Sequence, residues 1–408
     1  MGIEKLTNVL RNEINELVEK GTSKGKELVV TGFKRGDGVK GTRIFIEGYD
    51  NKEFIKMNSN SYLGMSIREE VIKAEEEATV KYGAGPGAVR FISGTYKPHT
   101  DLEAKLAAFH GRESAMIFSS AYVSIMGTVV PLITPDTIII SDELNHNCII
   151  NAMRLARPKD KTIYKHLDMQ GLEDEIIKAK GNCKRLMIVT DGIFSMRGDI
   201  APLDLINNIV RKYDADFEEG AFLVVDDSHG VGAIGKTGRG TEEYCNTKVD
   251  ILVATLGKAL GINGGYVVAN STITQYLREK APFYIYSNPI TPSEACATLK
   301  SLEILNSNKG VELLDHLRKL TKLFKEGLIN IGYETIMSEH PVVPLMVRDT
   351  KKTSDLVKYL KEKGILGTGL NYPVVPKGSE EIRFQVCADH TENDINYVLN
   401  ALEEYKKI

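Results

Sequence analysis

The sequence predicts an α/β fold, with a large domain built on a mostly parallel sheet and a smaller α+β domain after it. Two observations indicate this. Between about residues 57 and 292, short apolar runs alternate with stretches of helical spacing. After Pro292 a long helical stretch leads to two further strand signals. Near-continuous apolar strands separated by helices are typical of parallel sheets covered on both faces. At 408 residues the chain exceeds what one core supports.

The chain therefore divides into three predicted parts: an N-terminal helix and arm (residues 1–56), a large domain (57–292) and a C-terminal α+β domain (293–408). In the first part, helical spacing of apolar residues covers about Asn8–Lys20. The glycine-rich stretch Gly21–Gly48 follows, with a short strand signal at Arg43–Glu47.

The large domain contains six strand-like runs and at least four helical patterns between them. The predicted strands are Ser114–Phe118, Thr137–Ser141, Leu186–Thr190, Phe222–Asp226, Ile251–Thr255 and Gly265–Ala269. The predicted helices include Thr100–Phe109, Glu143–Arg154, Leu172–Ala179 and Leu203–Tyr213. Ligands of such sheets bind beyond the carboxyl ends of the strands, so polar residues there are candidates for a site.

The C-terminal domain is predicted from one long helix, two strands and two shorter helices. The helical pattern covers Ser293–Ile331, and the strand signals are Val342–Val347 and Ile382–Val386. A helix at Thr353–Lys363 lies between these strands, and a last helix begins at Glu392.

Composition argues against several classes of function. The net charge is -3 with acids and bases intermingled, so neither a nucleic-acid partner nor a membrane surface is indicated. No apolar run approaches the roughly 18 residues of a membrane span. The five cysteines are scattered without a C-x-x-C pair and the histidines form no metal-binding pattern, so we expect no metal and reduced thiols in the cytoplasm.

Lys258 follows the predicted strand Ile251–Thr255 and lies between Gly257 and Gly261. A lysine after a strand is most often a solvated charge. At this point, however, an amine can be held close to a cofactor carbonyl, where desolvation favours its nucleophilic form.

Asp226 and His146 also follow predicted strands. The Asp226 carboxylate at the end of a buried strand needs a partner, which a protonated pyridine nitrogen would supply, although Asp226 could instead cap the next turn. His146 could stack on a cofactor ring and assist proton transfer, or simply add polarity at a helix start.

Two further clusters suit parts of the same cofactor. The Ser195 hydroxyl follows the strand Leu186–Thr190 and could bond a phenolic oxygen. Ser119, Ser120, Ala121 and Tyr122 open a helix, where backbone N–H groups bind phosphate. The loop Gly83–Gly87 matches no nucleotide motif, and either a close approach to substrate or a structural turn would explain it.

Taken together, these residues identify a resemblance to the α-oxoamine synthases, a family of fold-type I enzymes that use pyridoxal 5′-phosphate (PLP). It runs from about residue 40 to the C-terminus. The segments that carry it are Asn60–Gly64, Gly85–Arg90, Ser93–Thr95, His99 with Leu102 and Glu103, Asp142–His146, Asp191–Ser195, Asp226–Gly232 and Thr255–Ala259.

The resemblance implies a role for each candidate residue. Lys258 would carry PLP as a Schiff base, Asp226 would pair with its pyridinium nitrogen, and His146 would stack on the ring. Ser195 and His229 would approach the phenolic oxygen. The phosphate would be held by Ser120, Ala121, Tyr122 and Thr255. Arg383, with Asn60, would grip the substrate carboxylate, a task that suits a guanidinium fork. His99 and Glu103 would be structural.

The family condenses an amino acid with an acyl-CoA, and the resemblance implies a homodimer with its active site at the subunit interface. Lys258 would remove the α-proton, and His146 would donate a proton to the developing oxyanion. The segment Ser287–Pro292 departs from the family pattern through Pro289 and Pro292, as does Ala121, where glycine is common.

The segments Ala84–Arg90 and Tyr372–Pro376 favour the glycine C-acetyltransferase branch, which joins glycine to acetyl-CoA. The alternative is 8-amino-7-oxononanoate synthase, which joins alanine to a pimeloyl thioester with decarboxylation. Serine palmitoyltransferase, 5-aminolevulinate synthase and an aminotransferase are further alternatives. A non-catalytic subunit is disfavoured because such subunits usually lack the lysine.

Overall fold

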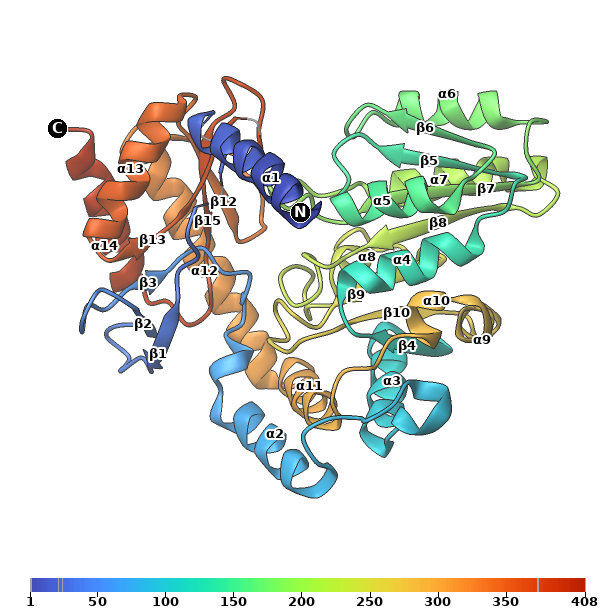
Figure 1. Ribbon diagram of the computed structural model, residues 1–408, viewed down its shortest axis with the longest axis horizontal. Coiled ribbons are helices and arrows are strands. Elements are labelled where there is room, and N and C mark those ends of the chain that lie inside the picture. The colour runs from blue at the N-terminus through green and yellow to red at the C-terminus, as the bar shows by residue number, and fades with distance from the viewer. Residues whose placement is uncertain (1, 21, 24, 373, 408) are drawn as a thin grey trace.

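The structure is a computed structural model that describes residues 2–20, 22–23, 25–372 and 374–407 (Figure 1). Two predicted features fall partly outside the described residues: Gly21 begins the glycine-rich arm, and Pro373 belongs to the segment Tyr372–Pro376. Within the described ranges, no helix is long and apolar enough to cross a membrane.

A seven-stranded sheet with the order β4-β10-β9-β8-β7-β5-β6 forms the centre of the large half of the molecule. Its strands are β4 (Ser114–Phe118), β5 (Thr137–Asp142), β6 (Asp160–Tyr164), β7 (Arg185–Asp191), β8 (Ala221–Asp226), β9 (Ile251–Thr255) and β10 (Gly265–Ala269). The strands from β5 to β9 pair in parallel, whereas β10 runs antiparallel to both β4 and β9. The predicted mostly parallel sheet is confirmed.

Both faces of this sheet are buried, because successive side chains of a strand point to opposite faces. In β5, Ile138 and Ile140 join one apolar cluster and Ile139 joins another. The first cluster is covered by α3 (Lys97–His110), α6 (Met169–Ala179) and α7 (Leu203–Tyr213). The second is covered by α4 (Ala121–Leu132), α5 (Asn147–Ala156), α9 (Ser271–Lys280) and α10 (Pro282–Ile285).

A second, four-stranded sheet with the order β11-β12-β15-β14 lies in the C-terminal part. Its strands are β11 (Glu334–Thr335), β12 (Val342–Met346), β14 (Thr368–Leu370) and β15 (Glu381–Gln385), and every neighbouring pair is antiparallel. The helices of this part are α11 (Pro292–Leu305), α12 (Asn308–Asn330), α13 (Thr350–Glu362) and α14 (Glu392–Tyr405).

The N-terminal arm pairs with the C-terminal part. β1 (Val30–Lys34) pairs with β2 (Arg43–Ile46), and β3 (Ile55–Lys56) runs parallel to β13 (Ile365–Leu366). A buried ion pair between Arg43 and Asp394 ties the arm to the start of α14. The remaining elements are α1 (Gly2–Glu19), α2 (Glu69–Tyr82), α8 (Thr241–Tyr244), and three short turns at Met65–Ile67, Arg90–Gly94 and Asp214–Asp216.

Among the elements that differ from the sequence-based expectation, three have a clear local cause. β6 was not predicted because it is a polar edge strand, largely exposed, and lacks an apolar run. The expected helix Ser293–Ile331 is two helices, since the chain breaks at Asn306 and Ser307, residues that favour helix ends. α5 begins at Asn147 rather than Glu143, because His146 caps it with its own side chain.

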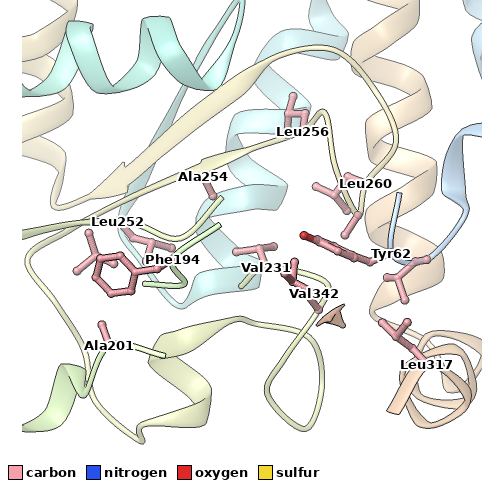
Figure 2. Packing of buried hydrophobic residues seen from close by; sticks show 14 of the residues in the cluster. Tyr62, Phe194, Ala201, Val231, Leu252, Ala254, Leu256, Leu260, Leu317 and Val342 are labelled. Atoms are coloured by element: carbon pink, nitrogen blue, oxygen red, sulfur yellow. The ribbon is translucent and has the colours of Figure 1, made fainter. Parts of the chain in front are cut away.

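One continuous apolar cluster joins the two sheets. Figure 2 shows the ring of Tyr62 among Val231, Leu260 and Val342, the last of which belongs to β12 of the smaller sheet. Tyr62 is fully buried. The candidate site therefore lies beside the junction of the two sheets, where residues from both can reach it.

Candidate active site

A pocket opens at the carboxyl ends of β7, β8 and β9, next to the first residues of α4 and α5. It is lined by Ala121, Tyr122, His146, Cys148, Asp191, Ile193, Ser195, Asp226, Ser228, His229 and Lys258. Seven of the residues predicted for the site thus line one pocket. This is the location expected for a ligand of a parallel sheet.

Lys258 projects into the pocket from the turn that follows β9. Burial lowers the pKa of its amine to about 8, although the carboxylates of Asp226 and Asp191 act in the opposite direction. A substantial fraction of the amine is therefore neutral near physiological pH, as a nucleophile or base requires.

Asp226 and Asp191 end neighbouring strands and are directly paired in the β7–β8 register. Burial, together with the nearby Asp226 charge, raises the pKa of Asp191 well above its usual range. Asp191 Oδ2 accepts a hydrogen bond from the His146 backbone at 2.9 Å, and Asp226 Oδ1 accepts one from the Ser228 backbone at 3.0 Å. Two buried carboxyl groups and one lysine are thus brought together in one pocket.

His146 caps α5, as one of the two interpretations of the sequence expects, and it also lines the pocket. Its Nδ1 accepts a hydrogen bond from the Cys148 backbone N–H at 3.2 Å. A ring nitrogen that accepts carries no proton, which assigns the proton of the neutral ring to Nε2. Burial lowers the pKa of His146, which favours this neutral form.

Ser195 and His229 both line the pocket. Phe194, the residue before Ser195, packs against His166, and the two rings meet edge-on with their centroids 4.3 Å apart. His229 Nδ1 lies 2.7 Å from the Tyr62 hydroxyl, and burial lowers the pKa of His229 well below its usual range. Tyr62 fixes the orientation of the His229 ring.

The start of α4 forms another wall. Ser120 is the N-cap, and its hydroxyl accepts from the Val123 backbone at 3.2 Å. Gly265 packs so closely that an added Cβ would lie 2.5 Å from the Ala121 backbone. Thr255 Oγ1 donates to the Gly264 carbonyl at 3.2 Å. Ser120 and Thr255, both predicted for the site, are not among the residues that line the pocket.

Arg383 and Asn60 are brought together although 323 positions separate them. Arg383 Nη2 donates to Asn60 Oδ1 at 3.2 Å. The Gln385 amide, oriented with its oxygen toward the guanidinium, accepts from Arg383 Nη1 at 2.6 Å. Burial lowers the pKa of Arg383, which nevertheless remains a cation.

Sequence reasoning missed four residues of this region: Cys148, Asp191, Ser228 and Tyr62. Asp191 had a readable signal, because it ends the strand next to Asp226. Cys148 and Ser228 come two residues after His146 and Asp226, but nothing in their residue type pointed to a role. Ser228 Oγ is buried on the pocket wall with no hydrogen-bond partner among the described residues.

A lysine, a strand-end aspartate and a helix N-terminus around one pocket of this sheet define a fold-type I PLP-dependent transferase. The chain matches the family model described as aminotransferase class I and II over residues 52–402. An 8-amino-7-oxononanoate synthase from Petrotoga mobilis is 36% identical over 401 residues, which cover 98% of this chain and 97% of the relative. Another, from Bacillus pumilus, is 38% identical over 360 residues, covering 88% and 89%.

Solved structures are similar over the whole chain. Serine palmitoyltransferase of Sphingomonas wittichii superposes with a TM-score of 0.87 at 26% identity, covering 98% of this chain and 96% of that one. A structure of SPT with PLP has a TM-score of 0.87 at 25% identity, covering 99% and 98%. The chain belongs to the aminotransferase class I and II family and, within it, to the α-oxoamine synthases, so the predicted family and fold are confirmed.

The comparisons correct one part of the sequence-based expectation. The curated relatives are named 8-amino-7-oxononanoate synthase, the alternative in the sequence analysis, and not glycine C-acetyltransferase. The segment Ala84–Arg90, one of the two that favoured the acetyltransferase, does not line the pocket described above.

Proposed function

We propose that the chain is an 8-amino-7-oxononanoate synthase, which joins alanine to a pimeloyl thioester and releases carbon dioxide and the free thiol. The single observation that carries the reaction class is Lys258, an amine of lowered pKa beside the strand-end carboxylate Asp226. The choice of substrates is supported by relatives of that name at 34–38% identity that match most of the chain.

The pocket residues fit PLP. Asp226 would face the pyridinium nitrogen, His146 would lie against the ring, and Ser195 and His229 would meet the phenolic oxygen. The phosphate would take the N-terminus of α4 at Ser120–Tyr122, with Thr255 beside it. The Ser228 hydroxyl, which has no partner within the part of the chain that the structure describes, is a further donor that a bound polar group would satisfy. When bound, PLP supplies an electron sink for negative charge at the α-carbon of the amino acid.

Two residues of the chain would move protons. Lys258 Nζ would accept the α-proton of alanine, a step that its lowered pKa favours. His146 carries its proton on Nε2 and would donate it to the thioester oxygen as charge develops there. Lys258 is thus the proposed base and His146 the proposed acid.

Arg383 and Asn60 would bind the substrate carboxylate. The guanidinium is fixed on one side by Asn60 and on another by Gln385, so its orientation is set before substrate arrives. A planar guanidinium binds carboxylate through two parallel hydrogen bonds, which orients the α-carbon as well as holding it.

We further propose that the enzyme is a homodimer with the active site at its interface. The helix α1 supports this proposal, because the structure shows none of its side chains buried and its apolar residues face solvent. Those exposed by about half or more include Ile3, Leu6, Val9, Ile14, Leu17 and Val18. Such a continuous apolar face is typical of a surface that another chain covers. The five free thiols fit a cytoplasmic location.

A second candidate function is serine palmitoyltransferase, because solved structures of that enzyme superpose over nearly the whole chain. Their identity to this chain, at 25–26%, is lower than that of the curated relatives. The two proposals differ in both the amino acid and the length of the acyl chain, so one assay separates them.

The test measures thiol release by the purified, PLP-loaded protein with each pairing of alanine, glycine or serine and pimeloyl-, acetyl- or palmitoyl-CoA. Alanine with pimeloyl-CoA is expected to give a kcat/KM at least about tenfold above every other pairing. Lys258→Ala should lower it about 100-fold or more, whereas Lys351→Ala on the exposed side of α13 should not. A preference for serine with palmitoyl-CoA, or for glycine with acetyl-CoA, would refute the proposal.

A further inference from the structure

Cys148 lies between two residues of the proposed active site. It is the second residue of α5, is almost fully buried, and lines the pocket. Its Sγ is 2.9 Å from His146 Nδ1 and 3.7 Å from Asp226 Oδ2. The other four cysteines do not belong to the pocket lining.

The His146 ring nitrogen next to the thiol is already engaged as the acceptor of a backbone hydrogen bond. Nδ1 has one in-plane lone pair, and the Cys148 backbone N–H already points at it from 3.2 Å. The backbone contact therefore does not depend on the side chain at position 148. The backbone N–H of residue 148 therefore favours the Nε2–H form of His146 with any side chain at position 148.

Asp226 is the acceptor that remains for the thiol. Its Oδ1 receives the Ser228 backbone N–H at 3.0 Å, and its Oδ2 is the atom that faces Cys148 Sγ. Burial, with the nearby charges of Asp226 and Asp191, raises the pKa of the thiol, so the sulfur keeps its proton. A protonated thiol beside a buried carboxylate oxygen is a donor.

We propose that Cys148 is a positioning residue of the active site, whose thiol donates to Asp226 Oδ2 while its backbone N–H fixes the Nε2–H form of His146. The thiol thereby holds the Asp226 carboxylate in the orientation in which it would meet the cofactor nitrogen. The effect of this hydrogen bond on cofactor binding rests on the proposed function. The hydrogen bond itself is independent of the proposed function.

The charged and titratable groups around the thiol come from every neighbouring element. Asp191 ends β7, Asp226 ends β8, and Lys258 follows β9, while His146 precedes the thiol on α5 and His229 lies across the pocket. The thiol donates to Asp226 Oδ2 at 3.7 Å, whereas its 2.9 Å contact with His146 Nδ1 has no donor fixed by geometry alone.

Three substitutions separate a hydrogen bond from simple packing. Cys148→Ser keeps a donor, Cys148→Val fills a similar volume without a donor, and Cys148→Ala removes both. Cys183→Ala is the matched control, because Cys183 is half-buried and donates to the Ala179 carbonyl at 3.8 Å on the far helix α6.

The experiment has two readouts on the full-length protein. The first is the Raman S–H stretching band of Cys148, taken as the wild-type spectrum minus that of Cys148→Ala. The second is the Kd for PLP by equilibrium dialysis. We expect the band at the lowered frequency of a hydrogen-bonded thiol. We also expect a Kd about tenfold higher in Cys148→Val and Cys148→Ala, close to wild type in Cys148→Ser, and unchanged in Cys183→Ala.

A band typical of a thiol without an acceptor, or a wild-type Kd in Cys148→Val combined with a raised Kd in Cys148→Ser, would overturn the positioning role and leave only packing. A hydrogen-bonded band in a wild-type protein that binds no PLP would refute the proposed function instead, and would support the hydrogen bond donated by the Cys148 thiol. The two failures are therefore distinguishable.

Discussion

Arg383 shows how a single side chain can depend on the whole molecule for its environment. It lies on β15 of the smaller sheet, yet its hydrogen-bond partner Asn60 precedes the large sheet in the sequence. Two residues away on the same strand, burial raises the pKa of Glu381 to about 7, although the Arg383 charge opposes this shift. The guanidinium is thus a partly buried cation that donates to the neutral amides of Asn60 and Gln385, which leaves its charge available for a carboxylate substrate.

The prediction at this scale is that Arg383→Lys raises the KM for alanine about 30-fold or more with a smaller change in kcat. A lysine cannot reproduce the two parallel hydrogen bonds, and charged hydrogen bonds contribute about 1.5–3 kcal/mol. Steady-state kinetics with alanine varied checks this. Arg348→Lys, at an exposed ion pair with Glu334, is the control and should leave KM unchanged. An unaltered KM in Arg383→Lys would place the substrate carboxylate elsewhere.

At the scale of elements, His166 links three segments. Its Nδ1 is 3.0 Å from Asp142 Oδ1 at the end of β5, and its Nε2 is 3.2 Å from Asp199 Oδ2 in the loop that carries Ser195. Burial opposes the charge on the ring, but the hydrogen bonds to the two carboxylates outweigh it and raise the pKa of His166 to about 9. The Ser195 loop is therefore fastened to the sheet by a charged bridge.

This bridge predicts a pH-dependent stability. The folded pKa of about 9 lies above the unfolded value of about 6.5. The stabilisation is thus fully present below about pH 6.5 and is lost as the pH rises through about 9. His166→Asn should cost about 1–3 kcal/mol more at about pH 6 than at about pH 9.5, as measured by urea unfolding. An equal cost at both values would contradict the charged bridge.

Much of the element pattern could be predicted, because local periodicity determines it. The strands Ile251–Thr255 and Gly265–Ala269 and the helix Leu203–Tyr213 have the predicted bounds, since each is a buried apolar run or a strongly amphipathic stretch. β6 was not predicted because an edge strand needs no apolar run. The pairing of β3 with β13 was not predicted because it joins residues more than 300 positions apart.

The candidate site likewise contains residues that a local sequence signal indicates and residues that have no such signal. Lys258, Asp226 and His146 could be proposed from their places after strands, before any resemblance was considered. Arg383 and Asn60 came only from the resemblance, because no local signal connects them. Cys148 was missed because its contacts depend on the relative placement of α5 and β8, which the sequence does not reveal at a single buried cysteine.

For the whole molecule, the exposed face of α1 is the feature that a monomer does not explain. Leu10 is 46% exposed and Ile14 is 58% exposed, and both belong to the apolar side of the helix. A helix that buries nothing and yet has a strongly apolar side gains its stability from a surface outside its own chain. In the proposed homodimer, a second subunit would supply that surface.

The corresponding prediction is that Leu10→Glu combined with Ile14→Glu shifts the protein from dimer to monomer in sedimentation velocity runs and lowers kcat. Burying two carboxylates in an apolar interface is costly, so association should weaken strongly. Asn12→Glu, on the opposite side of α1, adds a charge without touching that face and should remain dimeric. A double variant that stays dimeric would show that the apolar face of α1 is not part of the interface.

The most direct test of the account is to load the protein with PLP, fix the cofactor by borohydride reduction and locate the label by peptide mass spectrometry. A pyridoxyl group is expected on Lys258, whose amine lies in the pocket with a pKa lowered to about 8. Lys325 is a built-in comparison, because its amine is also buried with a pKa of about 8 but is occupied by the carbonyls of Ser338 and His340. A label on Lys325 or on surface lysines, or no stable label at all, would contradict the assignment of Lys258 and with it the proposed reaction.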